Sequence, residues 1–250
     1  MQFNDPEYAF LDANVIRGQL TTDILLTLAE HGLLEPFWSQ GVIDEMRRNR
    51  PGGVNEQRID RRIGIMNEYF PDALISGHDH LIPEMQADPK DKHVLAAAVH
   101  GGCDVLVTDN VKDFKPPSTG PYAMRVERLS QFLNRKLQQQ RSRVVSALQT
   151  MVDRNRLDPR TMPALIDKMA TQPELRPFAH KLNESVPPEQ RGSHEALATN
   201  QQIGRIQAQA SAAFKGIARA DGAVFKAPRC NPETRRTDSA GHGQDRERDR

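Results

Sequence analysis

The sequence predicts an α/β fold with a parallel sheet flanked by helices, followed by an all-α subdomain and a disordered tail. In residues 1–126, short apolar runs alternate with segments whose apolar residues recur at helical spacing, as expected for a parallel sheet with helical crossovers. From Glu127 only the helical spacing continues, and after Pro188 the chain is polar. We therefore predict a sheet domain at 1–126, a helical subdomain at 127–185 and a polar tail at 186–250.

The sheet domain begins with a strand followed directly by an acid. Tyr8 to Leu11 forms a short apolar run, and Asp12 comes next. Asn14 and Val15 are expected to begin a turn, and a helix is expected from about Thr22 to Gly32. Ligands of open α/β sheets bind beyond the carboxyl ends of the strands, which is where this pattern places Asp12.

A second strand and helix bring another acid. Leu33 to Trp38 is predicted as a strand, and Ser39 is suited to cap a helix that holds Glu45 in its early turns. Another helix is expected at about Val54–Phe70, and a short strand at Ala73–Ile75. This alternation continues the parallel sheet.

The stretch from Ala87 to Phe114 is the centre of the predicted fold. Asp88 is suited to cap a helix, with Pro89 at its first position and Asp91 in its first turn. Gly101 and Gly102 are suited to end this helix.

A buried strand follows that helix. Val105 to Val107 is a continuous apolar run, the pattern of a parallel strand covered on both faces. Asp109 and Asp113 lie just beyond its carboxyl end, and Ala123 to Val126 is expected to be an edge strand. Four further helical patterns, separated by prolines, make up the subdomain at 127–185.

The net charge of +1 hides an asymmetry. Residues 1–126 carry 12 Lys and Arg against 19 Asp and Glu, a net of −7, whereas residues 127–250 carry 22 against 14, a net of +8. An acidic front fits a cation site and a basic back fits attraction to nucleic acid, although solvated surface charge explains both equally well. The two cysteines lie far apart, which favours a reducing, cytoplasmic setting, and no apolar run is long enough to cross a membrane.

Five acids are expected to meet at one edge of the sheet: Asp12, Glu45, Asp91, Asp109 and Asp113. Taken singly, each has an ordinary explanation as a turn, cap or surface residue. Taken together, clustered carboxylates favour a hard cation such as Mg²⁺ or Mn²⁺, which suits hydrolysis of phosphodiester bonds.

Four short motifs occur in order: FLDANV at 10–15, SQGVIDE at 39–45, DKHVLAAA at 91–98, and VTDN at 107–110 with Asp113 and Phe114 after it. In this order and at these spacings they resemble the PIN-domain ribonucleases, specifically the VapC-type toxins of type II toxin–antitoxin systems, here with a helical C-terminal extension. The resemblance covers roughly residues 8–126.

This resemblance implies a Mg²⁺- or Mn²⁺-dependent endoribonuclease that hydrolyses RNA, often tRNA or rRNA. It also implies a cognate antitoxin that blocks the site, and commonly a homodimer. Asp12, Glu45 and Asp91 match the three core acids of the family. Asn110 stands where many relatives have a further Asp, so the fourth catalytic acid is Asp109 or Asp113, and the expected metal ligands are Asp12, Glu45, Asp91 and Asp113. Thr108 matches a hydroxyl position that helps to hold the acids or a metal-bound water.

Other interpretations remain open at this stage. The chain is alternatively a non-catalytic PIN-like module that binds RNA or protein, or a structure-specific DNA nuclease with similar metal chemistry. His78 and His80 with His93 suggest zinc, but no third ligand has diagnostic spacing. Six arginines between 47 and 62 are candidates for phosphate or partner contacts, or form a solvated helix face. Trp38 is expected in the core.

Overall fold

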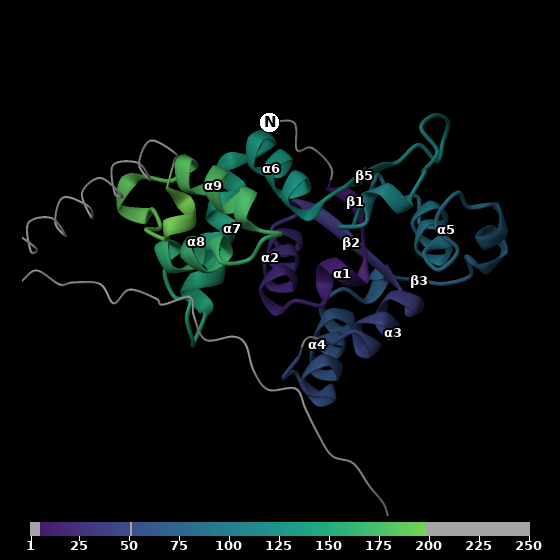
Figure 1. Ribbon diagram of the computed structural model, residues 1–250, viewed down its shortest axis with the longest axis horizontal. Coiled ribbons are helices and arrows are strands. Elements are labelled where there is room, and N and C mark those ends of the chain that lie inside the picture. Colours follow the sequence, from purple (N-terminus) through teal and green to yellow (C-terminus); the bar gives the residue numbers. More distant parts are fainter. Residues whose placement is uncertain (1–5, 51, 199–250) are drawn as a thin grey trace, which may run out of the picture. The chain divides into compact units, whose positions relative to one another are not determined.

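A five-stranded sheet forms the centre of the protein, and all of its strand pairs are parallel (Figure 1). The computed structural model describes residues 6–50 and 52–198. The strand order is β3-β2-β1-β4-β5, with bounds β1 Glu7–Leu11, β2 Leu34–Ser39, β3 Leu74–Ile75, β4 Val105–Val107 and β5 Arg125–Glu127. The predicted parallel sheet is confirmed, and the last strand lies at an edge as expected.

The two central strands are buried apolar runs. Leu11 of β1 pairs with Val107 of β4, and the Asp12 N–H extends the pairing by donating to the Val107 carbonyl at 3.1 Å. All three residues of β4 are fully buried, which confirms the prediction of a strand covered on both faces. This register brings the residues after β1 and β4 together at one edge of the sheet.

The helices around the sheet are α1 Ala13–Ile16, α2 Gln19–Glu30, α3 Gln40–Arg48, α4 Glu56–Tyr69 and α5 Lys92–His100. The Ser39 hydroxyl accepts from the Val42 N–H and caps α3, as predicted. The turn expected after Asp12 is instead the short helix α1, which Asp12 caps by accepting from the Ala13 N–H.

The start of α5 differs from the prediction. The helix begins at Lys92 with Asp91 at its N-cap position, so Asp88 is not the cap. The Asp88 side chain accepts from the Lys90 N–H at 3.2 Å, and its carbonyl accepts from the Asp91 N–H at 2.8 Å. Because an Asp followed by Pro also favours a turn, Asp88 starts a turn that precedes the helix.

The helical subdomain consists of α6 Leu129–Gln139, α7 Arg141–Arg154, α8 Met162–Ala170 and α9 Arg176–Ser185. It packs on the sheet domain through α7, which lies against α2 (Figure 1). At this contact Arg143 donates to the His31 carbonyl at 2.7 Å, and Arg154 donates to the Thr27 hydroxyl at 2.6 Å. One cluster of buried apolar side chains runs through both parts.

A buried ion-pair network also joins α6 to the sheet. The Lys136 side chain is 3% exposed and its ammonium lies 2.6 Å from a Glu7 carboxylate oxygen of β1. Arg135 pairs with the same carboxylate at 3.0 Å and with Glu127 of β5 at 2.9 Å. Burial lowers the pKa of Lys136, and the Glu7 carboxylate opposes this shift.

Residues 186–198 were assigned by sequence to the polar tail, whereas the structure packs part of this segment on α8 and α9. Val186 and Leu197 are buried, and the His194 N–H donates to Asp167 of α8 at 2.7 Å. The rest of the predicted tail, 199–250, lies outside the described residues. Within residues 6–50 and 52–198, no helix is both long and apolar enough to span a membrane.

Candidate functional site

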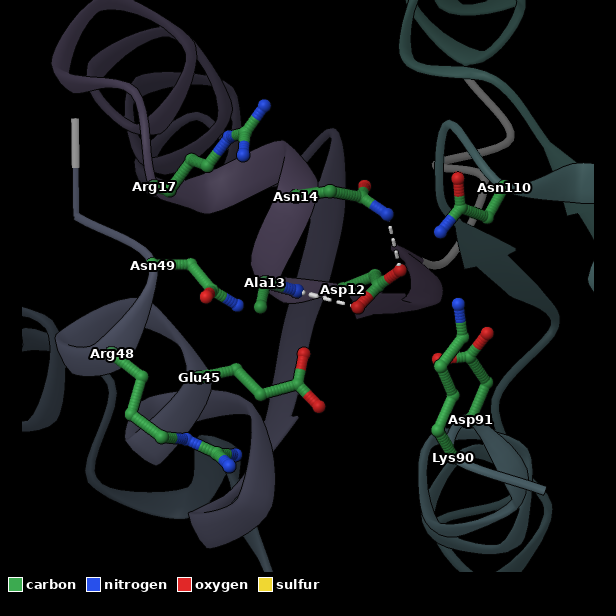
Figure 2. A pocket seen from close by; sticks show the side chains of 10 residues that line it. All are labelled: Asp12, Ala13, Asn14, Arg17, Glu45, Arg48, Asn49, Lys90, Asp91 and Asn110. Atoms are coloured by element: carbon green, nitrogen blue, oxygen red, sulfur yellow. Dashed lines mark hydrogen bonds between the residues drawn. The ribbon is translucent and has the colours of Figure 1, made fainter. Parts of the chain in front are cut away.

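Three of the five predicted acids line one pocket at the carboxyl edge of the sheet. Asp12 follows β1, Glu45 lies on α3 and Asp91 lies at the N-cap position of α5, and together they border a cavity of about 390 Å³. Figure 2 shows the Asp12 and Glu45 carboxylates facing the hollow, with Asp91 on its other side. We call this cavity the acid pocket. Its other lining residues are Ala13, Asn14, Arg17, Arg48, Asn49, Lys90 and Asn110.

Asp12 is the most buried of the three acids, with 5% of its surface exposed. One carboxylate oxygen accepts from the Ala13 N–H at 2.6 Å, and the other accepts from Asn14 at 2.6 Å and from the Thr108 hydroxyl at 2.7 Å. All three donors are neutral. Burial therefore dominates and raises the pKa of Asp12 to about 6, with the Glu45 and Asp91 charges adding to the rise.

The sequence identified one of these hydrogen-bond partners, Thr108, and missed another, Asn14. The predicted role of Thr108 in holding an acid is confirmed by its bond to Asp12. Asn14 was missed, although it is central: its amide donates to Asp12 and Thr108, and its oxygen accepts from the Asp109 N–H at 3.1 Å. Its position two residues after the first acid was the available signal.

Asp91 carries an unsatisfied oxygen. Its Oδ2 atom is buried and has no hydrogen-bond partner among the described residues. Burial raises the pKa of Asp91, and the charges of Asp88, Asp113 and Glu45 add to this effect. A buried carboxylate oxygen without a donor is costly, so its position beside two other acids suits a bound cation.

Glu45 is held by a histidine that sequence reasoning did not assign to this site. His93 of α5 lies with its Nε2 atom 3.0 Å from Glu45 Oε1, and this hydrogen bond raises the pKa of His93. The contact depends on Gly41 of α3, because a Cβ there would stand 2.7 Å from His93 Nδ1. Glycine inside a helix is usually unfavourable, and Gly41 was therefore the available signal.

Neither candidate for the fourth acid lines the acid pocket. Asp113 borders a neighbouring pocket with Asp88 and Lys115, although it is near enough to raise the pKa of Asp91. Asp109 faces another pocket, with Arg17 and Glu174. The structure therefore brings Asp12, Glu45 and Asp91 together and leaves the two later acids outside.

Cationic side chains share the pocket with the acids. Arg17, Arg48 and Lys90 line it, so a substrate with a negative charge meets attraction as well as carboxylates. Other members of the predicted arginine group are held within the protein. Arg47 pairs with Asp60 at 2.9 Å, and Arg62 donates to the Arg17 carbonyl at 2.7 Å.

The residues fit a hard divalent cation that keeps most of its water. The donors are carboxylate oxygens, and one of them has no partner among the described residues. Burial raises the pKa of Asp12, and its acidic neighbours add to the rise. In the described part of the chain, no three His, Cys, Asp or Glu side chains approach closely enough to enclose an ion. Mg²⁺ is commonly held by one or two carboxylates together with waters and substrate phosphate, so this wider spacing suits it. Among the described residues, the three histidines considered for zinc do not form part of a group of three side chains that could hold an ion. His93 pairs with Glu45, and His80 contacts the Gly77 carbonyl.

Comparisons with known proteins agree with this geometry. Residues 8–112 match the family described as PIN domain. Over 111 residues the chain is 32% identical to the "Putative ribonuclease VapC50" of Mycobacterium tuberculosis (strain ATCC 25618 / H37Rv). This match covers 44% of the chain and 66% of the relative, slightly under two thirds of its length. No solved structure matches the chain.

Proposed function

We propose that the chain is a VapC-like PIN-domain protein that acts as a Mg²⁺- or Mn²⁺-dependent endoribonuclease, the toxin of a toxin–antitoxin pair. The observation that carries the proposal is the meeting of Asp12, Glu45 and Asp91 in one pocket, where a buried Asp91 oxygen has no hydrogen-bond partner among the described residues. The name of the mycobacterial relative supports RNA as the substrate.

Asp12, Asp91 and Glu45 are the residues that would hold the cation. When bound, a divalent cation supplies a water of lowered pKa and a Lewis acid for the scissile phosphate. Asp113 lies near enough to influence Asp91, and we keep it as a fourth ligand reached through water. The proposal assigns no metal contact to Asp109.

The other side chains of the pocket bind and orient the substrate. Arg17, Arg48 and Lys90 are placed to attract the RNA phosphates, since charge-assisted hydrogen bonds to phosphate are the stronger ones. His93 restrains the Glu45 carboxylate, while Asn14 and Thr108 fix that of Asp12. Fixed carboxylates reduce the reorganisation needed when substrate arrives.

We extend the proposal to the partners that a VapC-like toxin implies. These are a tRNA or rRNA substrate, a cognate antitoxin that covers the pocket, and a second copy of the chain in a homodimer, in the cytoplasm. The net charge of +8 on residues 127–250 supports attraction to RNA.

Cleavage of total RNA by the purified full chain tests the proposal. With Mg²⁺ or Mn²⁺ we expect discrete fragments, and we expect EDTA or the Asp91→Asn substitution to abolish them. Asp153→Asn is the matched control, because Asp153 is an exposed residue of α7 that bonds only Gln149 nearby. Single-stranded and branched DNA form parallel arms.

Three results would overturn the proposal. Cleavage of DNA alone would replace RNA with a DNA substrate. RNA binding without cleavage, by folded protein freed of any antitoxin, would favour the binding module. Cleavage that persists in Asp91→Asn and in EDTA would remove the metal mechanism.

A further inference from the structure

A second pocket continues the acid pocket towards the helical subdomain. It has a volume of about 420 Å³ and shares Asn14, Arg17 and Asn49 with the acid pocket, so the two cavities meet along these side chains. Figure 2 shows the Arg17 side chain turned away from the three acids. We call this cavity the Asp109 pocket, after the acid that faces it.

Two carboxylates from different parts of the fold line the Asp109 pocket. Asp109 follows β4 and is half-buried, whereas Glu174 is exposed and comes from the segment between α8 and α9. Burial raises the pKa of Asp109, and the charge of Glu174 raises it further, which places the two acids within electrostatic reach of each other. The helical subdomain therefore contributes an acid to a cavity that adjoins the proposed active site and shares lining residues with it.

The position of Asp109 is tied to that of Asp12. Asn14 accepts from the Asp109 N–H with its oxygen and donates to Asp12 with its amide nitrogen. One short side chain thus links an acid of each pocket. A ligand group in the Asp109 pocket would lie next to whatever occupies the acid pocket.

The chemistry of the Asp109 pocket suits a nucleobase. Two carboxylates repel a phosphate and accept hydrogen bonds, so the favoured ligand group presents N–H donors. Arg17 and Arg50 line the same cavity and can contact the sugar-phosphate chain that carries the base. Unstacked bases of single-stranded RNA are commonly recognised through hydrogen bonds to their Watson–Crick edges.

Guanine is the base that matches a carboxylate best. Its N1–H and N2 amino group are adjacent donors, whereas adenine and cytosine each present one amino group beside an unprotonated ring nitrogen. We propose, on the basis of the ribonuclease function above, that the Asp109 pocket binds a guanine next to the cleaved phosphodiester, with Asp109 and Glu174 accepting from its Watson–Crick edge.

The test is the cleavage of a pool of short single-stranded RNAs with randomised internal positions, followed by sequencing of the product ends. We expect guanine to be enriched at one fixed position beside the cut, by about tenfold or more, as for other paired contacts to a base edge. Glu174→Gln and Asp109→Asn should each reduce this enrichment by about tenfold. Because Glu174 is exposed, its substitution is expected to leave the fold intact.

Glu184→Gln is the matched control, since Glu184 is an exposed acid of α9 that pairs only with Lys181 nearby. It should retain the wild-type base profile. A wild-type profile without guanine enrichment, or one that Glu174→Gln and Asp109→Asn leave unchanged, would overturn the inference.

A binding measurement separates this inference from the proposed function. Fluorescence anisotropy with the Asp12→Asn protein would compare short RNAs that differ by one guanine. If no RNA is cleaved by the wild type, but guanine-selective binding is found and is lost with Glu174→Gln, the ribonuclease proposal fails and the base pocket stands. Binding without base preference overturns the pocket, whatever the cleavage result.

Discussion

Replacing Asp12 by Asn should make the folded protein more stable at neutral pH while abolishing cleavage. Asp12 is almost fully buried, and neutral groups donate its hydrogen bonds. The folded protein therefore maintains a carboxylate whose charged form is disfavoured. An amide has nearly the same volume and carries no charge.

The size of the effect follows from the pKa of Asp12, which rises from 3.8 to about 6 on folding. A shift of this size corresponds to about 3 kcal/mol of unfolding free energy above pH 7. The amide also turns its own N–H donors towards the Asn14 amide and the Thr108 hydroxyl, which costs about 1 kcal/mol. We expect a net gain of roughly 2 kcal/mol, or about 4–8 °C in melting temperature.

The pH dependence has a definite sign. Because folding raises the pKa, Asp12 imposes no electrostatic penalty on the folded state well below pH 3.8, where its carboxyl is protonated in both states. The penalty grows as pH rises and is complete above pH 6. At pH 4 the electrostatic penalty has fallen to about 0.5 kcal/mol, so the variant should be no more stable than the parent there. The gain should appear between pH 4 and pH 7.

Urea unfolding followed by tryptophan fluorescence measures this effect. Trp38 is the single tryptophan of the sequence, lies fully buried in β2 as predicted, and packs edge-on against Phe70. The parent, Asp12→Asn and the control Asp153→Asn would be compared at pH 4 and 7.5. An equal stability difference at both pH values, or a less stable Asp12→Asn at pH 7.5, would refute the reasoning.

Three further predictions follow from the same geometry. At low Mg²⁺, cleavage should increase as pH rises through 6 because Asp12 ionises and can then bind the cation. A cleavage rate that stays flat from pH 5 to 7.5 at low Mg²⁺ would contradict this. Gly41→Ala should displace His93 from Glu45 and lower the cleavage rate about tenfold or more. The control is Gly64→Ala on α4, where an added Cβ meets nothing within 4 Å. This control should leave the cleavage rate unchanged and add about 1 kcal/mol to the free energy of unfolding. Lys136→Ala should cost about 3 kcal/mol in urea unfolding by leaving the partly buried Glu7 carboxylate less compensated. A cost below about 1 kcal/mol would show that Arg125 and Arg135 suffice to compensate Glu7.

The sequence was most informative where a local pattern decides the structure. The apolar run at Val105–Val107 has no polar position to expose, which favoured a strand covered on both faces, and all three residues are buried. Ser39 before an amphipathic segment predicted the start of α3, and the acids after β1 and on α3 and α5 were identified from their places in these elements.

Local sequence patterns did not predict the structure where the same residues are compatible with two different conformations. Asp88 with Pro89 suits a helix start or a turn, and a hydrogen bond to Lys90 decided for the turn. Asp109 and Asp113 follow the same strand, but side-chain type does not determine which way each points in a loop. The Glu45–His93 contact joins residues 48 positions apart, so no spacing rule could reveal it.

The shared core of the two parts has a consequence for how such a chain can change over generations. The helices beyond residue 126 pack on α2 and contact β1 through the Lys136–Glu7 ion pair. Recombination could therefore not exchange them as an independent domain. A gene truncated at that boundary would encode a sheet domain in which Glu7 has lost its ion pairs with Arg135 and Lys136. The apolar surface that the helices cover would also be exposed to water. The sheet domain and the helical subdomain must therefore be inherited together.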